Sequence, residues 1–221
     1  MGKACIFDLD GTILNTLDDL GNACNCALAH FGYPTHDLKA YEQMVGNGFL
    51  VLVIRSLPEG EHERLSPKDF DAIVAYAKAS YAHNMCVYTK PYEGLPEALH
   101  SLHSQNIALC VLSNKPEPMT QTLVATYFSD LPFARVYGGR DDYPLKPDPS
   151  RLLIMLDEIG VQAKDCLFIG DSNVDMMTAH AAHVPAIGVA WGFRGATELL
   201  KYGASKLLTH PKELADLFLE L

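Results

Sequence analysis

The sequence of 221 residues contains no long hydrophobic run, and no stretch reaches the roughly 18 apolar residues that a membrane-spanning helix needs. Basic residues are also scarce, since 17 Lys and Arg stand against 27 Asp and Glu and the net charge is −10. Such a surface repels nucleic acid and anionic lipid. We therefore expect neither a nucleic-acid nor a membrane partner, and we expect a local cationic site for any anionic substrate.

The sequence also lacks a basic start followed by an apolar run and a small-residue cleavage site, so nothing in it indicates secretion. Internal repeats and low-complexity tracts are missing as well. We expect a cytoplasmic protein whose six cysteines are reduced. Cys5, Cys110 and Cys166 lie within apolar runs, where a free cysteine packs as a small hydrophobic residue.

Five short apolar runs, each followed by a segment of helical periodicity, predict strands. The runs are continuous rather than alternating, which indicates strands covered on both faces and hence a parallel sheet. The expected fold class is α/β, with a Rossmann-like, doubly wound parallel sheet. The predicted strands are residues 4–7, 107–112, 133–137, 166–169 and 186–190, and helices are expected at 95–102, 152–159 and 211–219.

The segment between the first two predicted strands has helical periodicity and contains no good strand. It runs from about residue 16 to residue 88, far longer than a strand-to-helix connection needs. Pro91 and Gly94 break the helical pattern after it. We therefore expect a core formed by residues 1–15 and 89–221, with an inserted α-helical domain at 16–88.

Polar side chains cluster where four of the apolar runs end or lead into the next helix. In open parallel sheets the ligand lies beyond the carboxyl ends of the strands, so these clusters should face one pocket. The candidates are Asp8, Asp10 and Thr12 in the stretch D-L-D-G-T, Ser113 and Asn114, Lys146 before Pro147, and Asp171 and Asp175 in G-D-S-N-V-D.

Carboxylates gathered in one pocket repel each other unless a hard cation joins them, and a set of oxygen ligands suits Mg²⁺. The Lys146 ammonium adds a second positive charge, and Ser113 can hold phosphoryl oxygens. Past the end of its strand the chain turns at Gly11, so Asp8 and Asp10 can approach one substrate from two directions. One carboxylate can then attack phosphorus while the other transfers protons.

The four clusters, in this order, resemble the four motifs of the haloacid dehalogenase superfamily of phosphohydrolases. The resemblance implies that Asp8 is the nucleophile and a Mg²⁺ ligand, and that Asp10 is the acid/base whose backbone carbonyl also binds the metal. It further implies that Asp171 is the third metal ligand. The remaining implied roles are phosphate binding for Ser113, Asn114 and Lys146, and support of the metal site from nearby for Asp175 and Thr12.

The helical insert resembles the cap domain of this superfamily, which implies that the insert selects a small-molecule phosphate ester. The turn Val45-Gly46-Asn47-Gly48 and the segment 191–195 resemble those of members that hydrolyse 2-phosphoglycolate. We therefore expect Gly46, Asn47 and Gly48 to contribute to substrate specificity. The sequence does not distinguish a monomer from a homodimer.

Other interpretations of the same residues stay open at the level of sequence. Ser113, Asn114 and Asp171 could be helix N-caps, and Lys146 or Asp175 could be surface charges. A sugar-phosphate mutase would use the same nucleophile. A receiver module of signalling proteins also gathers acidic residues and a lysine around an aspartate that is phosphorylated.

Overall fold

The computed structural model describes residues 2–218 of the chain, which form two compact units. One unit, here called the core unit, comprises residues 1–15 and 91–221, and the other, the helical unit, comprises Thr16–Lys90. The boundaries expected from the sequence were 15/16 and 88/89. Two short strands, β2 (Leu14–Asn15) and β3 (Lys90–Pro91), pair where the chain passes from one unit to the other.

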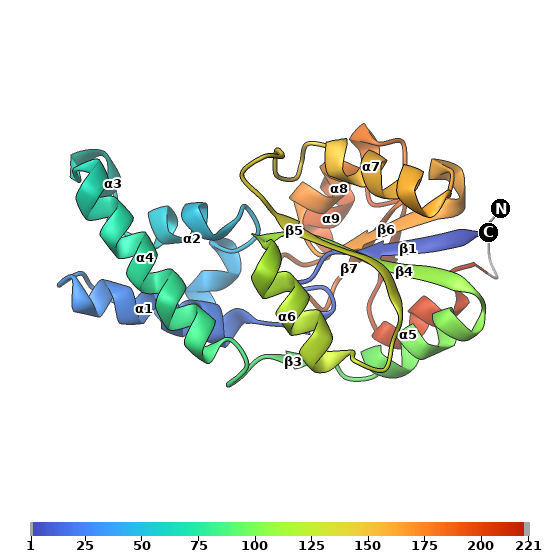
Figure 1. The fold of residues 1–221 in the computed structure, drawn as a ribbon, viewed down its shortest axis with the longest axis horizontal. Coiled ribbons are helices and arrows are strands. Elements are labelled where there is room, and N and C mark those ends of the chain that lie inside the picture. The colour runs from blue at the N-terminus through green and yellow to red at the C-terminus, as the bar shows by residue number, and fades with distance from the viewer. Residues whose placement is uncertain (1, 219–221) are drawn as a thin grey trace. The chain divides into compact units, whose positions relative to one another are not determined.

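The core unit is built on a six-stranded sheet with the strand order β5-β4-β1-β6-β7-β8, and every pair in it is parallel. This confirms the predicted α/β fold with a parallel sheet (Figure 1). The strands are β1 (Lys3–Phe7), β4 (Ile107–Pro116), β5 (Phe133–Gly139), β6 (Cys166–Gly170), β7 (Ala186–Val189) and β8 (Lys206–Leu208). All five predicted strands are present. The edge strand β8 was not predicted, because three residues that include a lysine carry little periodic signal.

The central strands are buried on both faces, as their continuous apolar sequences predict. Ala4, Cys5, Ile6 and Phe7 of β1 are all fully buried. Because successive side chains of a strand point to opposite faces, both faces of the sheet need helices over them. Cys5, Cys110 and Cys166 are also fully buried, which confirms their predicted packing role.

Helices cover both faces of this sheet. Residues of α7, α8 and α9 share one apolar cluster with Ile6, Leu112 and Phe168, so these helices pack on one face. Helices α5 and α6 lie on the other face (Figure 1). The bounds are α5 (Leu95–Ser104), α6 (Glu117–Tyr127), α7 (Ser150–Ile159), α8 (Asn173–Ala181) and α9 (Ala196–Lys201), with short 3₁₀ helices η2 (Ala163–Asp165) and η3 (Pro211–Asp216).

The last element differs from its prediction. The sequence predicts a helix over 211–219, whereas the chain forms the 3₁₀ helix η3, which ends at Asp216. The side chains of His210 and Glu213 each accept a hydrogen bond from the backbone N–H of the other residue, and this reciprocal pair closes the first turn. 3₁₀ helices usually occur as short pieces, and a run of six residues is longer than most of them. Leu219 lies outside the described residues.

The helical unit contains α1 (Leu17–His30), η1 (Leu38–Gln43), α2 (Phe49–Ser56), α3 (Glu61–Arg64) and α4 (Pro67–Asn84). No strand lies within 16–88, as the sequence predicts. Helix α4 begins with Pro67 after the N-cap Ser66, whose hydroxyl accepts from the Asp69 backbone. Helices α1, α2 and α4 contact one another, and each buries apolar side chains, among them Leu28, Leu52 and Ile73.

One buried carboxylate ties the two ends of the helical unit together. Asp19, in the first turn of α1, accepts from the backbone N–H of Tyr88 at 3.1 Å and from that of Thr89 at 2.8 Å. Hydrogen bonds to a charged acceptor are stronger than neutral ones. The segment that leaves the helical unit is therefore fixed to the segment that enters it.

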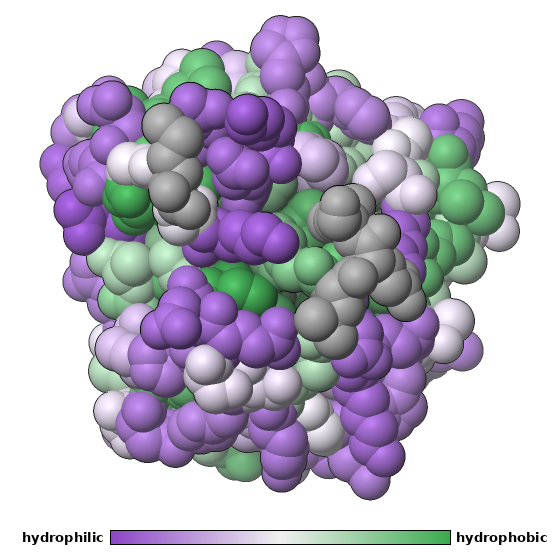
Figure 2. Space-filling view, turned by 90° about the vertical axis from the view of Figure 1, so that its right-hand side faces the viewer, coloured by the Kyte–Doolittle hydropathy of each residue, from purple (hydrophilic) through white to green (hydrophobic). Residues whose placement is uncertain are grey.

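The face of the core unit that carries the amino ends of the strands is mostly hydrophilic (Figure 2). Hydrophobic residues show in narrower areas between the polar ones. Among residues 2–218, no helix has the length and apolar character needed to cross a bilayer. The polar clusters predicted to form the site lie at the opposite, carboxyl ends of the strands.

Candidate active site

The candidate site lies at the carboxyl ends of three neighbouring strands, β4, β1 and β6. In the register of the sheet, Phe7 at the end of β1 is paired with Val111 of β4 on one side and with Ile169 of β6 on the other. The strand β4, which is the next strand of this sheet after β1 along the chain, lies on one side of β1, and β6, which comes later in the chain, lies on the other side. This is the switch point at which open parallel sheets bind their ligands.

Asp8 is held in place by the tight turn that follows β1. Its backbone N–H donates to Ile169 O at 2.9 Å, which continues the sheet by one residue, and Leu9 O then accepts the N–H groups that close the turn. Gly11 has a φ of +87°, a backbone conformation that residues with a Cβ atom rarely adopt. A Cβ on Gly11 would also lie 2.3 Å from Asp171 Oδ2, so this position must be glycine for Asp171 to approach.

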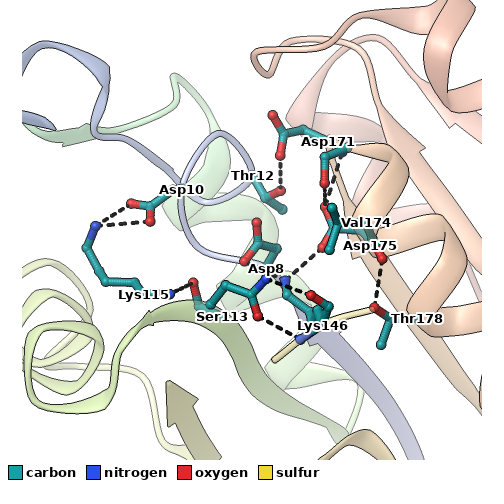
Figure 3. Close-up of polar contacts among 12 residues, drawn as sticks. Asp8, Asp10, Thr12, Ser113, Lys115, Lys146, Asp171, Val174, Asp175 and Thr178 are labelled. Atoms are coloured by element: carbon teal, nitrogen blue, oxygen red, sulfur yellow. Dashed lines mark hydrogen bonds and ion pairs between the residues drawn. The ribbon is translucent and has the colours of Figure 1, made fainter. Parts of the chain in front are cut away.

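Three buried carboxylates meet at this point. One oxygen from each of Asp8, Asp171 and Asp175 lies within 4.8 Å of the other two. The ammonium of Lys146 lies 2.8 Å from Asp8 Oδ1 and 2.7 Å from Asp175 Oδ1 (Figure 3). When all three carboxylates are ionised, the single ammonium leaves two negative charges uncompensated in a buried pocket.

Burial governs the proton affinities of these groups. It raises the pKa of Asp8 to about 7, although the neighbouring Lys146 ammonium opposes that rise. Burial, then the charges of Asp175 and Asp8, raise the pKa of Asp171 well above its ordinary value. For Lys146, burial works to lower the pKa, but Asp175 and Asp8 outweigh it and raise the pKa. The pocket therefore favours an added positive charge.

The donor set fits a hard divalent cation. Asp8 Oδ1 is buried and has an ion-pair contact with Lys146, but no hydrogen bond of good geometry among the described residues. A buried carboxylate oxygen without hydrogen bonds is costly unless a cation binds it. Two uncompensated charges on oxygen ligands match Mg²⁺ in charge and in ligand type. Asp8 and Asp171, both predicted ligands, are members of this cluster.

Asp175 belongs to the cluster through its position in helix α8. It is the third residue of that helix, and its Oδ2 accepts from the backbone N–H of Ser172 at 3.1 Å and from the Ser172 hydroxyl at 2.6 Å. Its Oδ1 accepts from Lys146. Asp175 is fully buried, so it is not a surface acid of the helix. Its predicted role as support for a metal stays a prediction.

The side chain of Asp10 points away from the three-carboxylate cluster (Figure 3). Both of its oxygens accept from the ammonium of Lys115, at 2.8 and 3.0 Å. Asp8 and Asp10 therefore differ in surroundings, because Asp8 lies inside the cluster with Lys146 and Asp10 lies outside it with another lysine. Two carboxylates in different surroundings can take different chemical roles.

The two residues predicted to follow β4 as phosphate ligands lie within the extended strand itself, and both are buried. The Ser113 hydroxyl accepts from the backbone N–H of Lys115 at 3.2 Å. Asn114 bonds both backbone groups of Lys146, donating to its carbonyl at 3.0 Å and accepting from its N–H at 2.8 Å. Asn114 thus holds the loop that carries Lys146, and phosphate contact by Ser113 and Asn114 stays a prediction.

The segment 191–193 contributes contacts that the sequence did not reveal. The backbone N–H of Phe193 donates to Asp171 Oδ2 at 2.7 Å, and the indole N–H of Trp191 donates to Thr12 O at 3.0 Å. The Thr12 hydroxyl donates to Asp171 Oδ1 at 3.4 Å. Asp171 is therefore oriented from two sides. Lys115 is the other site residue that the sequence analysis did not assign.

Substitution of Gly192 by alanine is expected to cost about 2 to 3 kcal/mol of unfolding free energy, because the added atom overpacks the site. Its Cβ would lie 2.2 Å from Asp171 Cβ and 2.4 Å from Gly11 O. Gly160→Ala is the control, since a Cβ there meets nothing within 4 Å and its left-handed backbone, with φ 66° and ψ 32°, costs about 1 kcal/mol by itself. Urea unfolding measures both. Equal losses would show that Gly192 is not tightly packed.

The predicted specificity turn lies in the helical unit. Gly48 is the N-cap of α2, and Gly46 and Gly48 both have positive φ, at 122° and 89°. The turn is braced by Arg55, whose Nη1 donates to Met44 O at 2.9 Å. Gly46, Asn47 and Gly48 therefore have a defined backbone, and their role in specificity stays a prediction.

Comparison with known proteins gives a consistent family. The model of haloacid dehalogenase-like hydrolases matches residues 5–189. A phosphoglycolate phosphatase of Rhodospirillum rubrum is 35% identical over 196 residues, which cover 87% of this chain and 81% of the relative. Phosphoglycolate phosphatase 1 of Pseudomonas aeruginosa is 30% identical over 213 residues, covering 96% of this chain and 78% of the relative.

Solved structures show the same fold. A crystal structure from Lactobacillus delbrueckii subsp. bulgaricus, assigned as a phosphoglycolate phosphatase, superposes with a TM-score of 0.88 at 28% identity and covers 97% of both chains. The sequence match, the fold and the placement of the four polar clusters agree. The chain is thus a hydrolase that belongs to the haloacid dehalogenase-like family, and the relatives named here are phosphoglycolate phosphatases.

Proposed function

We propose that this protein is a Mg²⁺-dependent phosphomonoesterase that cleaves a small-metabolite phosphate ester through an aspartyl-phosphate at Asp8. The observation that carries the proposal is the buried cluster of three carboxylates around one lysine, which leaves two negative charges for a cation to balance. Membership of a hydrolase family leaves no reason to retain the receiver-module alternative.

In the first half of the reaction an oxygen of Asp8 attacks phosphorus. The bond from phosphorus to the ester oxygen breaks, its electron pair stays on that oxygen, and Asp10 gives its proton to the departing alkoxide. The Lys146 ammonium, 2.8 Å from Asp8 Oδ1, offsets the repulsion between the anionic nucleophile and the phosphoryl oxygens. The products are free alcohol and a phosphoryl group on Asp8.

In the second half a water molecule attacks the phosphoryl group on Asp8. Asp10, now ionised, takes a proton from that water, and the bond between phosphorus and the Asp8 oxygen breaks to release inorganic phosphate. Both residues then regain their starting forms. Ser113 and Lys146 hold the phosphoryl oxygens in this proposal.

The metal would be held by the carboxylates of Asp8 and Asp171 and by the backbone carbonyl of Asp10, with Asp175 and Thr12 supporting them. When bound, Mg²⁺ supplies charge that stabilises the phosphoryl oxygens and lowers the repulsion of the nucleophile. The fit of the cluster to two positive charges supports this assignment.

We propose 2-phosphoglycolate as the favoured substrate, because the relatives named above are phosphoglycolate phosphatases. The helical unit is proposed to be the cap that selects the ester, with Gly46, Asn47 and Gly48 as contributors. All six cysteines are free thiols, which a reducing compartment such as the cytoplasm favours. The proposed partner is the small ester alone, bound by a monomer or a homodimer.

The test is a screen of phosphate release from small phosphate esters, with Mg²⁺ and with a chelator in its place. We expect steady release that needs Mg²⁺ and is fastest with 2-phosphoglycolate. Formation of an isomerised sugar phosphate without net release would indicate the mutase instead. Release that is unchanged by the chelator would refute the metal assignment, and preference for an unrelated ester would refute the substrate.

A further inference from the structure

Lys115 is a buried cation that the reaction described above does not use. Its side chain is only 2% exposed, and its ammonium contacts both oxygens of Asp10, at 2.8 and 3.0 Å. Burial of a lysine is costly unless a charged partner compensates it. Here the charged partner is Asp10, which is the carboxylate that the proposed function uses for proton transfer.

The backbone of Lys115 is fixed on several sides, so the ammonium projects from a rigid base. Its N–H donates to the Ser113 hydroxyl at 3.2 Å, and its carbonyl accepts from the Thr120 hydroxyl at 3.1 Å. It lies within β4, which is paired with β1 and β5. The side chain therefore bridges the end of β4 and the turn after β1 (Figure 3).

We propose that Lys115 is a positioning residue for proton transfer, which holds the carboxylate of Asp10 toward the ester oxygen and away from the metal-binding cluster. The inference rests on the proposed function, since it assigns the means by which that site places its acid/base. With both oxygens of Asp10 bound to one ammonium, rotation of the carboxylate is restricted. When a proton occupies one oxygen, the other still accepts from Lys115.

Two neighbouring lysines thereby receive different tasks. Lys146 contacts Asp8 and Asp175 and serves the phosphoryl side of the reaction. Lys115 contacts Asp10 and serves the leaving-group side. A group that acts through general acid catalysis matters most for esters whose leaving group is a strong base, because a weakly basic leaving group departs without a proton.

The experiment compares Lys115→Met with wild type on benzyl phosphate and on p-nitrophenyl phosphate, which have rings of similar size and leaving groups of different basicity. We expect kcat/KM, which reports the first phosphoryl transfer, to fall about 100-fold for benzyl phosphate. For p-nitrophenyl phosphate we expect a fall of less than about threefold. A lysine that bound the phosphate or only supported the fold would lower both values equally, and that result would overturn the proposal.

A double-mutant cycle gives the second test. In an Asp10→Asn background, Lys115→Met should cause no further loss with benzyl phosphate, since the two residues act as one unit. Independent, multiplicative losses would refute the proposal. If Lys115→Met does not fold, Lys115→Gln keeps a polar end near Asp10 and has to show the same dependence on the ester.

The outcomes separate this inference from the function on which it rests. Phosphate release that persists in Asp8→Asn would refute the aspartyl-phosphate mechanism itself. Loss of activity in Asp8→Asn, together with equal losses of the two esters in Lys115→Met, would leave the mechanism in place and refute only the role of Lys115.

Discussion

Asp8→Asn is expected to lower phosphate release from p-nitrophenyl phosphate by at least about 10⁴-fold, because the amide cannot attack phosphorus and no other carboxylate is placed to replace it. Asp171 and Asp175 belong to the same cluster, but Asp171 is engaged by Phe193 and Thr12, and Asp175 by Ser172 and Lys146. Asp8 Oδ1, by contrast, contacts the Lys146 ammonium but has no hydrogen bond of good geometry within residues 2–218. The initial rate of release in Mg²⁺ measures the effect.

The same variant should keep its stability, which separates loss of chemistry from loss of fold. Burial raises the pKa of Asp8 to about 7, so the ionised form is less favourable in the folded chain than in the unfolded one. Replacing it with a neutral isostere therefore removes a cost. We expect the urea midpoint of Asp8→Asn without divalent cation to equal or exceed that of wild type.

Trapping of the phosphorylated enzyme completes this prediction. Wild type quenched in acid during turnover should carry a phosphoryl group on residue 8, and Asp8→Asn should carry none. Phosphate release that persisted in Asp8→Asn, in a preparation free of other phosphatases, would contradict the assignment of the nucleophile.

The sheet and most of the site residues were predictable from the sequence because their signals are local. Continuous apolar runs such as Ala4–Phe7 indicate buried parallel strands, and polar residues directly after those runs must lie at one edge of the sheet. Asp8 and Asp171 were predicted in this way, and Lys146 was predicted from the loop that leads from the third run to the next helix. The structure brings Asp8 and Asp171 together, with the Lys146 ammonium beside Asp8. No contact had to be known in advance for these predictions.

The residues that the sequence analysis missed owe their roles to tertiary contacts. Lys115 and Asp10 are 105 residues apart, and nothing in the sequence marks this lysine as buried. Phe193 acts through its backbone N–H, which any residue but proline supplies, so its side chain carries no signal. Asn114 was predicted as a phosphate ligand, which stays a prediction, but its two hydrogen bonds to the backbone of Lys146 are a tertiary contact that the sequence did not indicate.

Lys146→Met is expected to lower kcat/KM by about 10² to 10³-fold, because it removes the positive charge that faces the nucleophile and the transferred group. It also leaves three buried carboxylates without their cationic partner, and breaking such a buried pair costs about 3 to 5 kcal/mol. Mg²⁺ should restore much of that stability, since it supplies charge to the same cluster. Thermal unfolding with and without Mg²⁺ measures this recovery.

The control for Lys146→Met is to compare its loss of kcat/KM on two esters with different leaving groups. Lys146 acts on phosphoryl oxygens, which every ester shares, so benzyl phosphate and p-nitrophenyl phosphate should lose the same factor in Lys146→Met. Lys115 touches the acid/base instead, so its loss should depend on the ester. Two buried lysines that contact different aspartates of one D-L-D motif should therefore give opposite patterns on the same two substrates. A Lys146→Met loss confined to benzyl phosphate would show that this ammonium serves the leaving group and that the division of charge between Asp8 and Asp10 is wrong.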